Sequence, residues 1–160
     1  MKKIGRTIKR RRKEGKTDYK ARMGFLKSGK ARLVIRKTNK HVIVQLVESD
    51  VAKDKVIKSV SSKKLISLGW PKENVGSLKS IGACYLTGLV FAKEVGNKEA
   101  IADFGLHRSA HSGRLYAVLK GAIEGGMKIK CNEKFLPNES RINANEKIKK
   151  AIEKVKGELK

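Results

Sequence analysis

The chain has 160 residues, of which 39% are hydrophobic, enough for one domain with a buried core. Its 39 lysines and arginines stand against 15 aspartates and glutamates, and the net charge of +24 favours a polyanionic partner, nucleic acid first and an anionic membrane surface second. Cys84 and Cys131 form no CxxC pair and fit a reducing cytosol. No apolar run has the length of a membrane span or the setting of a signal peptide, so we expect neither insertion nor secretion.

Positive charge is concentrated at the N-terminus. Residues 2–16 hold nine lysines and arginines beside a single acid, Glu14. A segment this charged and this poor in apolar groups cannot bury itself. We therefore expect residues 1–16 to form a basic arm that is disordered until a partner binds it.

A helix and an antiparallel set of strands follow the arm. Thr17 or Asp18 can cap a helix that Gly29 ends in a left-handed conformation. Runs rich in β-branched residues then predict strands at 32–37 and 41–48, joined by a tight turn at residues 38–40. The next predicted elements are a strand near 55–59 and a short helix at 62–68.

The second half alternates helices with strands. The strongest helix, 79–95, is apolar nearly all round, which indicates burial against the sheet, and Gly82, Ala83 and Gly88 allow a close approach. A buried strand at 100–104, a helix capped by Ser112 and ending at Gly125, and a strand at 127–131 complete the pattern, which implies right-handed parallel crossovers.

These elements predict an α/β fold with one domain at residues 17–142. Its mixed sheet combines antiparallel hairpin strands with parallel strands and is flanked by helices. Residues 143–160 should form a C-terminal helix, with Asn143 and Glu146 as a capping box.

One stretch, GFLKSGKA at residues 24–31, nearly matches the spacing of a phosphate-binding loop. Such a loop needs a strand before it and a helix after it, and here the predicted order is reversed. Ala31 also lacks the hydroxyl that would hold Mg²⁺. We interpret Gly29 as a helix-ending glycine and predict no nucleotide-binding role for Lys30.

The sequence gives little support for a catalytic or metal-binding site. His107 and His111 have a metal-ligand spacing but lie in a predicted loop without further clear ligands. A two-metal nuclease would need clustered carboxylates. Asp103 stands alone on a late strand, and we expect the acids Glu48, Asp50 and Asp54 to lie solvated in a turn. We therefore predict no enzyme activity, no cofactor and no metal.

Nucleic-acid binding is the hypothesis that remains. Basic residues lie on and around the first hairpin, beside the arm, and again after residue 107. Aromatic residues make up only 5% of the chain, and no RRM or KH motif occurs. The pattern favours recognition of folded RNA by shape and phosphate contacts over stacking on an extended single strand.

Several stretches, in order along the chain, resemble one known family. RRKEGKTDY at 11–19 is similar to its RRREGKTDY segment, and SGKARLVIRKTNKH at 28–41 is similar to its SGKPRLVVRKSNKH hairpin. ACYLTGL at 83–89, DFGL at 103–106 and LKGAIEGG at 119–126 add further similarity. The family is the archaeal and eukaryotic 5S rRNA-binding protein of the large ribosomal subunit, number eighteen in the universal scheme and number five in eukaryotes.

The resemblance implies a mixed sheet flanked by helices in a protein without catalysis. It also implies binding to 5S rRNA, attachment to 23S-type rRNA in the central protuberance beside a neighbouring 5S-associated ribosomal protein, and a place in cytoplasmic ribosomes. The chain departs from the family at 129–131 and at 141–148, which concerns its C-terminal RNA contacts. Two alternatives stay open: a metal-dependent nuclease on a related fold, and a basic protein that compacts DNA.

Charge and resemblance together select the RNA-binding candidates. We expect side chains at the end of the first hairpin, including Arg36, to project together outside the core. The full set is Lys9, Arg10, Arg11, Arg12, Lys13, Lys16, Thr17, Tyr19, Arg22, Arg32, Arg36, Thr38, Asn39, Lys40, His41, His107, Arg108 and Arg114.

Overall fold

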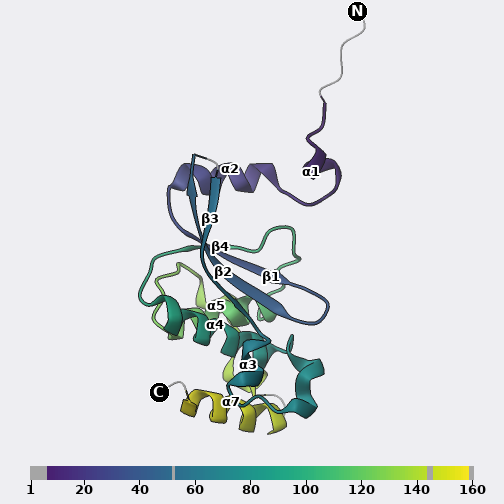
Figure 1. The fold of residues 1–160 in the computed structure, drawn as a ribbon, viewed down its shortest axis with the longest axis vertical. Coiled ribbons are helices and arrows are strands. Elements are labelled where there is room, and N and C mark those ends of the chain that lie inside the picture. Colours follow the sequence, from purple (N-terminus) through teal and green to yellow (C-terminus); the bar gives the residue numbers. More distant parts are fainter. Residues whose placement is uncertain (1–6, 52, 144–145, 159–160) are drawn as a thin grey trace, which may run out of the picture.

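The computed structural model describes residues 7–51, 53–143 and 146–158, and in them one four-stranded sheet has the order β3-β2-β1-β4 (Figure 1). The central strand β1 pairs antiparallel with β2 and parallel with β4, and β3 pairs antiparallel with β2. The strands are β1 (Arg32–Lys37), β2 (Val42–Asp50), β3 (Lys53–Ser61) and β4 (Ile101–Asp103). This mixed sheet confirms the predicted α/β fold class.

Helices lie on both sides of the sheet (Figure 1). α4 and α5 cover one face and enclose the core with it, and α7 packs on α4 away from the sheet. α2 lies across the end of the β2–β3 hairpin. The helices are α1 (Arg10–Lys13), α2 (Tyr19–Ser28), α3 (Lys64–Ser67), η1 (Lys72–Ser77), α4 (Ile81–Val95), α5 (Arg114–Glu124), η2 (Glu133–Phe135), α6 (Glu139–Ile142) and α7 (Glu146–Glu158).

The core forms because successive side chains of a strand point to opposite faces. Leu33 and Ile35 of β1 and Leu46 of β2 are fully buried in one cluster with α4 and α5. The predicted burial of the strongest helix is confirmed, since most of α4 is inaccessible to solvent. The intervening residues of β1 turn to the other face, which carries the charged side chains described below.

Two glycines let α4 and α5 touch backbone to backbone. A Cβ added at Gly88 would lie 2.1 Å from the carbonyl oxygen of Val118, and one added at Gly121 would lie 2.0 Å from that of Tyr85. Neither distance leaves room for any side chain, so the predicted close approach at Gly88 is confirmed. Gly82 makes room for side chains of α7, because a Cβ there would lie 2.6 Å from Ile148 Cγ2.

Local signals set several helix ends as predicted. The Asp18 carboxylate accepts from the amides of Lys20 and Ala21 at 2.9 and 3.1 Å and so caps α2. Gly29 ends the same helix with a left-handed φ of 61°. The order helix, glycine, strand confirms that the GFLKSGKA stretch is no phosphate-binding loop.

Three predicted details are wrong. The segment 127–131 makes a single parallel bridge, from Lys128 to Glu99, which lies before β4, and the three residues of β4 itself pair only with β1. Gly113 and not Ser112 caps α5; Ser112 instead bonds the carbonyls of Phe135 and Leu136, which ties α5 to η2.

The third concerns the arm. Residues 10–13, predicted to lack regular structure, form the one-turn helix α1, and Lys16 returns its amide to the Arg11 carbonyl at 2.9 Å. Residues 1–6 lie outside the described part of the chain. So do residues 144–145, and the capping box of Asn143 and Glu146 stays a prediction; Asn143 itself closes α6.

Candidate nucleic-acid interface

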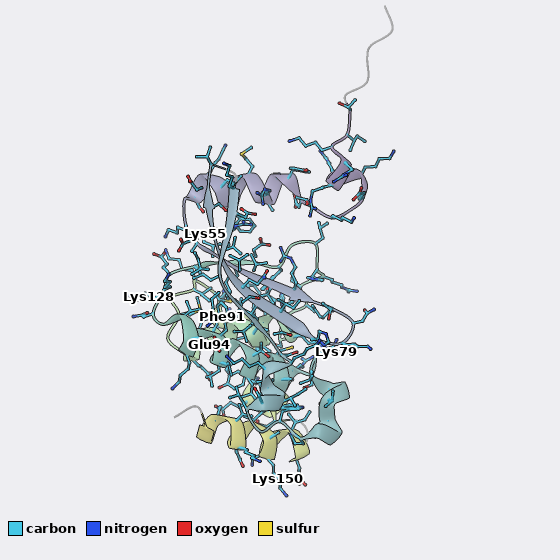
Figure 2. All side chains as sticks on the ribbon, in the orientation of Figure 1. Lys55, Lys79, Phe91, Glu94, Lys128 and Lys150 are labelled. Atoms are coloured by element: carbon cyan, nitrogen blue, oxygen red, sulfur yellow. The ribbon has the colours of Figure 1, made fainter. Side chains whose placement is uncertain are left out.

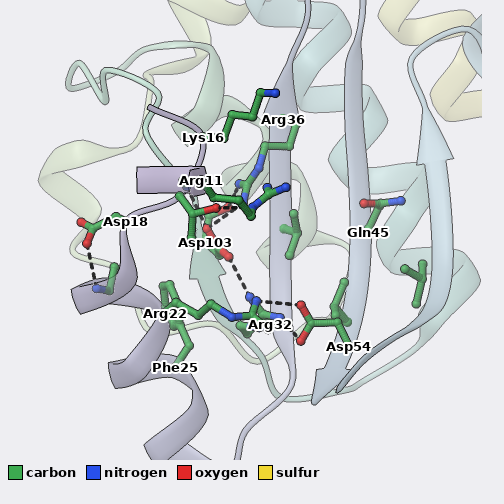
Figure 3. Close-up of a pocket in the computed structure, with 16 residues that line it drawn as sticks. Arg11, Lys16, Asp18, Arg22, Phe25, Arg32, Arg36, Gln45, Asp54 and Asp103 are labelled. Atoms are coloured by element: carbon green, nitrogen blue, oxygen red, sulfur yellow. Dashed lines mark hydrogen bonds and ion pairs between the residues drawn. The ribbon is translucent and has the colours of Figure 1, made fainter. Parts of the chain in front are cut away.

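The face of the sheet opposite α4 and α5 carries an ion-pair network. Arg32 and Arg36 of β1 point to this face, and the register of the parallel pair sets Asp103 of β4 opposite Val34, between them. Figure 3 shows the two guanidinium groups on either side of the Asp103 carboxylate. Strand alternation and one parallel pairing thus bring three charged groups together.

Arg32 is a buried member of this network. Its side chain is 7% exposed and forms ion pairs with Asp103 at 3.2 Å and with Asp54 of β3 at 2.8 Å. It also donates to the Ser49 hydroxyl at 3.2 Å. A buried charge needs such compensation. Arg32, predicted as an RNA contact, therefore holds β1, β3 and β4 together in this conformation.

Asp54 was expected to lie solvated in a turn; it is exposed, but it lies in β3 and is engaged by arginines. Its carboxylate accepts hydrogen bonds from Arg22 at 2.8 Å and from Ser49 at 2.7 Å, in addition to the Arg32 pair. Partial burial pushes the pKa of Asp54 upward, but the hydrogen bonds from Arg22, Ser49 and Arg32 outweigh burial and hold the pKa well below its usual range. The β2–β3 hairpin is thus fastened to α2 by charge.

Arg36 does not project freely from the hairpin as expected. Its guanidinium folds back to the Asp103 carboxylate at 3.1 Å and to the Asp103 carbonyl at 2.7 Å. Gly105, with φ of 59°, lies flat against it, and a Cβ there would come within 2.9 Å of Arg36 Cζ. The side chain is still 37% exposed. Arg36 is thus held by Asp103 while part of its side chain stays exposed.

α2 and the segment just before it, including residues 11–17, close over this network. The space between them and the sheet is a cavity of about 310 Å³, lined by the paired arginines and by Arg11, Lys16 and Thr17 (Figure 3). Phe25 of α2 stands 5.9 Å from the Arg32 guanidinium carbon. The wall of the cavity therefore combines basic side chains from the segment before α2 with the ion pairs of the sheet.

The basic residues before α2 are exposed, and some of them contact polar or aromatic neighbours close in the sequence. Lys9 lies over the Tyr19 ring at 4.6 Å, and Arg11 donates to the Thr17 hydroxyl at 2.8 Å. Thr17, Tyr19 and Arg22 are half-buried and anchor this segment. The exposed cations are Lys9, Arg10, Arg11, Arg12, Lys13 and Lys16.

A second group of basic and polar residues lies at the C-terminal end of β1, around the turn to β2. Thr38 and His41 close the turn through three hydrogen bonds of 2.8 to 3.0 Å, which leaves Asn39 and Lys40 exposed at its tip. His107 accepts from the Lys37 amide through Nε2 at 3.1 Å. Burial, followed by the charges of Arg36 and Lys37, lowers the pKa of His107 and favours this neutral acceptor. His107 thereby holds its loop against the sheet.

That loop completes a basic cleft of about 260 Å³. Lys37, Arg108, Arg114 and Arg141 all line it, from β1, the loop, α5 and α6. Arg141 was absent from the predicted site. Arg141 begins, with Ile142, the segment 141–148 that was compared with the family, and this position was the sequence signal that could have identified it. Only the tertiary fold brings it beside Arg114.

Other lysines are scattered widely. Figure 2 labels Lys55, Lys79, Lys128 and Lys150 on separate parts of the surface. Most of these isolated lysines need no binding partner to explain their position, because water solvates their charge. The two groups that converge, before α2 and around the end of β1, are the candidates for an interface.

The geometry gives the enzymatic alternatives no support. Of the three acids that line the cavity, Asp54 and Asp103 are engaged by arginines and Asp18 caps α2. Residues 7–51, 53–143 and 146–158 contain no cluster of three or more potential metal ligands. His111 packs against Phe135 with ring centres 4.4 Å apart, whereas His107 binds the Lys37 amide. Lys30, the lysine of the stretch that nearly matches a phosphate-binding loop, forms an ion pair with Glu99. No described helix is long and apolar enough to span a bilayer.

Comparison with known proteins agrees with this surface. The sequence profile of the family described as "Ribosomal large subunit proteins 60S L5, and 50S L18" matches residues 5–102. The chain belongs to this family. It is 40% identical to the large ribosomal subunit protein uL18 of Methanoregula boonei, over 94% of this chain and 91% of that protein. It is 44% identical to uL18 of Methanoculleus marisnigri, over 83% and 75% of the two chains.

Membership in the L5/L18 family confirms the predicted resemblance. It also identifies the chain as a structural constituent of the large ribosomal subunit in the cytoplasm and confirms that it is not an enzyme. A third relative, uL18 of Methanothermobacter thermautotrophicus, is 40% identical over 83% of this chain and 69% of that protein. The two basic groups can therefore be interpreted as surfaces of a ribosomal protein.

Proposed function

We propose that this L5/L18 family protein binds 5S rRNA and attaches it to the 23S-type rRNA in the central protuberance, next to another 5S-associated ribosomal protein. The observation that carries the proposal is the convergence of cations at two places beside one sheet. One is the segment before α2 and the other is the cleft of Lys37, Arg108, Arg114 and Arg141.

The candidate residues divide by their surroundings into contact and positioning groups. The contact group is exposed except for the half-buried His41, and its cations can meet phosphates at the surface, where their internal contacts, such as that of Arg11 with Thr17, are open to solvent. It consists of Lys9, Arg10, Arg11, Arg12, Lys13, Lys16, Asn39, Lys40, His41, Arg108 and Arg114.

The positioning group makes internal hydrogen bonds or ion pairs that fix the contact surface. Arg32 and Arg22 fasten α2 and its basic segment to the sheet, and His107 fixes the loop of Arg108. Arg36 has both characters, because its guanidinium binds Asp103 while 37% of its side chain remains exposed. The full group is Thr17, Tyr19, Arg22, Arg32, Arg36, Thr38 and His107.

Equilibrium binding to three labelled nucleic acids tests the proposal. The probes are 5S rRNA from a related archaeon, a structured RNA of equal length and a DNA duplex of equal length. Electrostatic binding alone would treat them alike, whereas a shaped 5S site should favour the first at every salt concentration. Equal affinity for the duplex would favour the DNA-compaction alternative. RNA cleavage that requires Mg²⁺ would reopen the nuclease alternative.

A further inference from the structure

An apolar cavity of about 360 Å³ lies outside the two basic openings, between the β1–β2 turn, α3 and η1. Leu78 is almost fully buried in it and Ile66 is half-buried. Val75 stands at its mouth with 43% of its surface exposed. The volume lies in the range of about 300–1,000 Å³ typical of small-ligand sites. A preformed apolar hollow on so basic a protein calls for a specific occupant.

The rim of this cavity is cationic. Lys40 of the turn, Lys63 before α3 and Lys79 before α4 all line it, and Figure 2 shows Lys79 beside the turn. No aspartate or glutamate is among the described residues of its wall. His41 adds an imidazole ring, one of the aromatic groups on which unstacked bases rest in RNA-binding proteins.

The apolar residues on the floor of the cavity and the lysines on its rim together indicate the chemistry of the occupant. A phosphate alone would gain nothing from Ile66, Val75 and Leu78, and an uncharged apolar ligand would gain nothing from three lysines. A nucleotide matches both, because its base has two apolar faces and its flanking phosphates are anionic. The base can lie on the apolar floor while the lysines neutralise the phosphates on either side.

The neighbouring cleft extends the same path. Lys37 and Ile81 line the basic cleft, and Lys40 and Lys79 line the apolar cavity. The two sites thus share the end of the β1–β2 hairpin and the start of α4. A strand whose phosphates occupy the cleft of Arg108 and Arg114 has the apolar cavity as its next pocket.

We propose that this cavity receives one unpaired base of the bound RNA, stacked against His41 and packed on Ile66, Val75 and Leu78, with its phosphates on Lys40, Lys63 and Lys79. The inference rests on the proposed function in that it takes the chain to bind RNA. It adds a base-binding site to a surface that otherwise contacts phosphates.

Amide chemical-shift titration of the whole protein tests the site directly. The probes are a single-stranded pentaribonucleotide pool, the abasic ribose-phosphate pentamer and a short RNA duplex. We expect saturable shifts at Lys40, His41, Val75 and Gly76 with the single strands only, since the abasic chain lacks the base and the duplex does not expose it. Equal shifts from the abasic pentamer would show that the lysines alone bind and would overturn the proposal.

A matched pair of variants gives the second arm. Val75→Glu places a carboxylate at the mouth of the cavity, and Val51→Glu makes the same change at a valine that is 91% exposed in the turn between β2 and β3. Because loss of base contact typically costs a large factor in affinity, we expect Val75→Glu to weaken pentanucleotide binding by about fivefold or more. Val51→Glu should change it less than twofold, with melting temperatures alike.

The outcomes separate this inference from the proposed function. If wild-type protein and Val75→Glu bind 5S rRNA equally and no RNA shifts the cavity amides, the base site is wrong and the function stands. If wild-type protein shows no preference for 5S rRNA but the pentanucleotides still shift the cavity amides, the function is wrong and the base site stands. Shifts from an acidic, leucine-rich peptide but from none of the RNAs would assign the cavity to a protein partner.

Discussion

The two faces of the sheet are held by different physical means. On one face, α4 and α5 pack on apolar side chains and approach so closely that Gly88 and Gly121 exclude any side chain. On the other, α2 and the β2–β3 hairpin are held by ion pairs that join Arg22, Arg32 and Asp54. The apolar face supplies stability that salt and pH barely affect. The polar face supplies a charged surface whose geometry depends on both.

The largest effect should come from breaking the apolar face. Gly121→Ala would push a methyl group against the Tyr85 carbonyl oxygen, and backbone cannot move aside as a flexible side chain can. We expect the free energy of unfolding to fall by about 3 kcal/mol or more, the upper end for overpacked cores. Urea denaturation followed by circular dichroism measures it.

Gly24→Ala is the matched control for that change. Gly24 lies inside α2 with nothing within 4 Å of an added Cβ. The same methyl group should there stabilise the helix by up to about 1 kcal/mol. If Gly121→Ala is tolerated as well as Gly24→Ala, the close contact between α4 and α5 is wrong.

The next effect comes from the buried charges of the polar face. Asp103→Ala leaves Arg32 buried with Asp54 as its remaining acid and releases Arg36. We expect a loss of about 3 kcal/mol, the lower end for a broken buried pair, because one partner persists. Glu99→Ala, which removes the exposed partner of Lys30, should leave the melting temperature unchanged. Equal effects of the two changes would show that Asp103 carries no buried charge pair.

Acid should weaken the polar face before the apolar one. The pKa of Asp54 is lowered in the folded protein, so its pairs add stability above the ordinary aspartate pKa of about 4 and lose it as pH falls through the folded value. Asp54→Asn should therefore melt a few degrees lower than wild type at pH 7 and converge with it toward pH 2. Melting curves across pH check this. A constant difference at every pH would mean that Asp54 acts through shape and not through charge.

The smallest expected effect concerns a single exposed cation. Arg12 of α1 is exposed, so Arg12→Ala should leave the melting temperature unchanged. Affinity for 5S rRNA should fall only a few-fold, and the salt dependence of log K should become shallower by about 0.7–0.9, the contribution of one phosphate contact. Lys150→Ala on α7, distant from both basic groups, is the control and should change neither quantity. A larger loss from Lys150→Ala would move the interface to the C-terminal helix.

Local sequence signals predicted most elements because their causes are local. Asp18 and Gly29 bound α2 through their own hydrogen bonds and φ angle, and β-branched runs mark β1 and β2. The strand predicted at 127–131 failed for the opposite reason. Whether a segment becomes a strand depends on a partner strand, and the three residues of β4 pair only with β1.

The candidate site shows the same difference between features with local causes and features that depend on distant parts of the chain. Charge alone located the exposed cations before α2 and around the β1–β2 turn, because exposed charge needs no partner in the chain. It could not separate them from Arg32 and Arg36. Those two arginines have a structural role because both pair with Asp103, about 70 positions further along the chain. The parallel pairing of β1 with β4 places Asp103 between them. Arg141 and Lys79 entered their sites through the same kind of long-range contact.

The sequence by itself thus determined the family, the α/β class, the charge that requires a polyanion and the glycines that permit close helix packing. Composition, periodicity and motif order are properties of the chain and persist in any conformation. Only the tertiary structure decided which arginines face inward, which acids neutralise them and where an apolar cavity opens beside basic residues. Those outcomes depend on strand register and on contacts between distant segments, and their energies exist only once the sheet has formed.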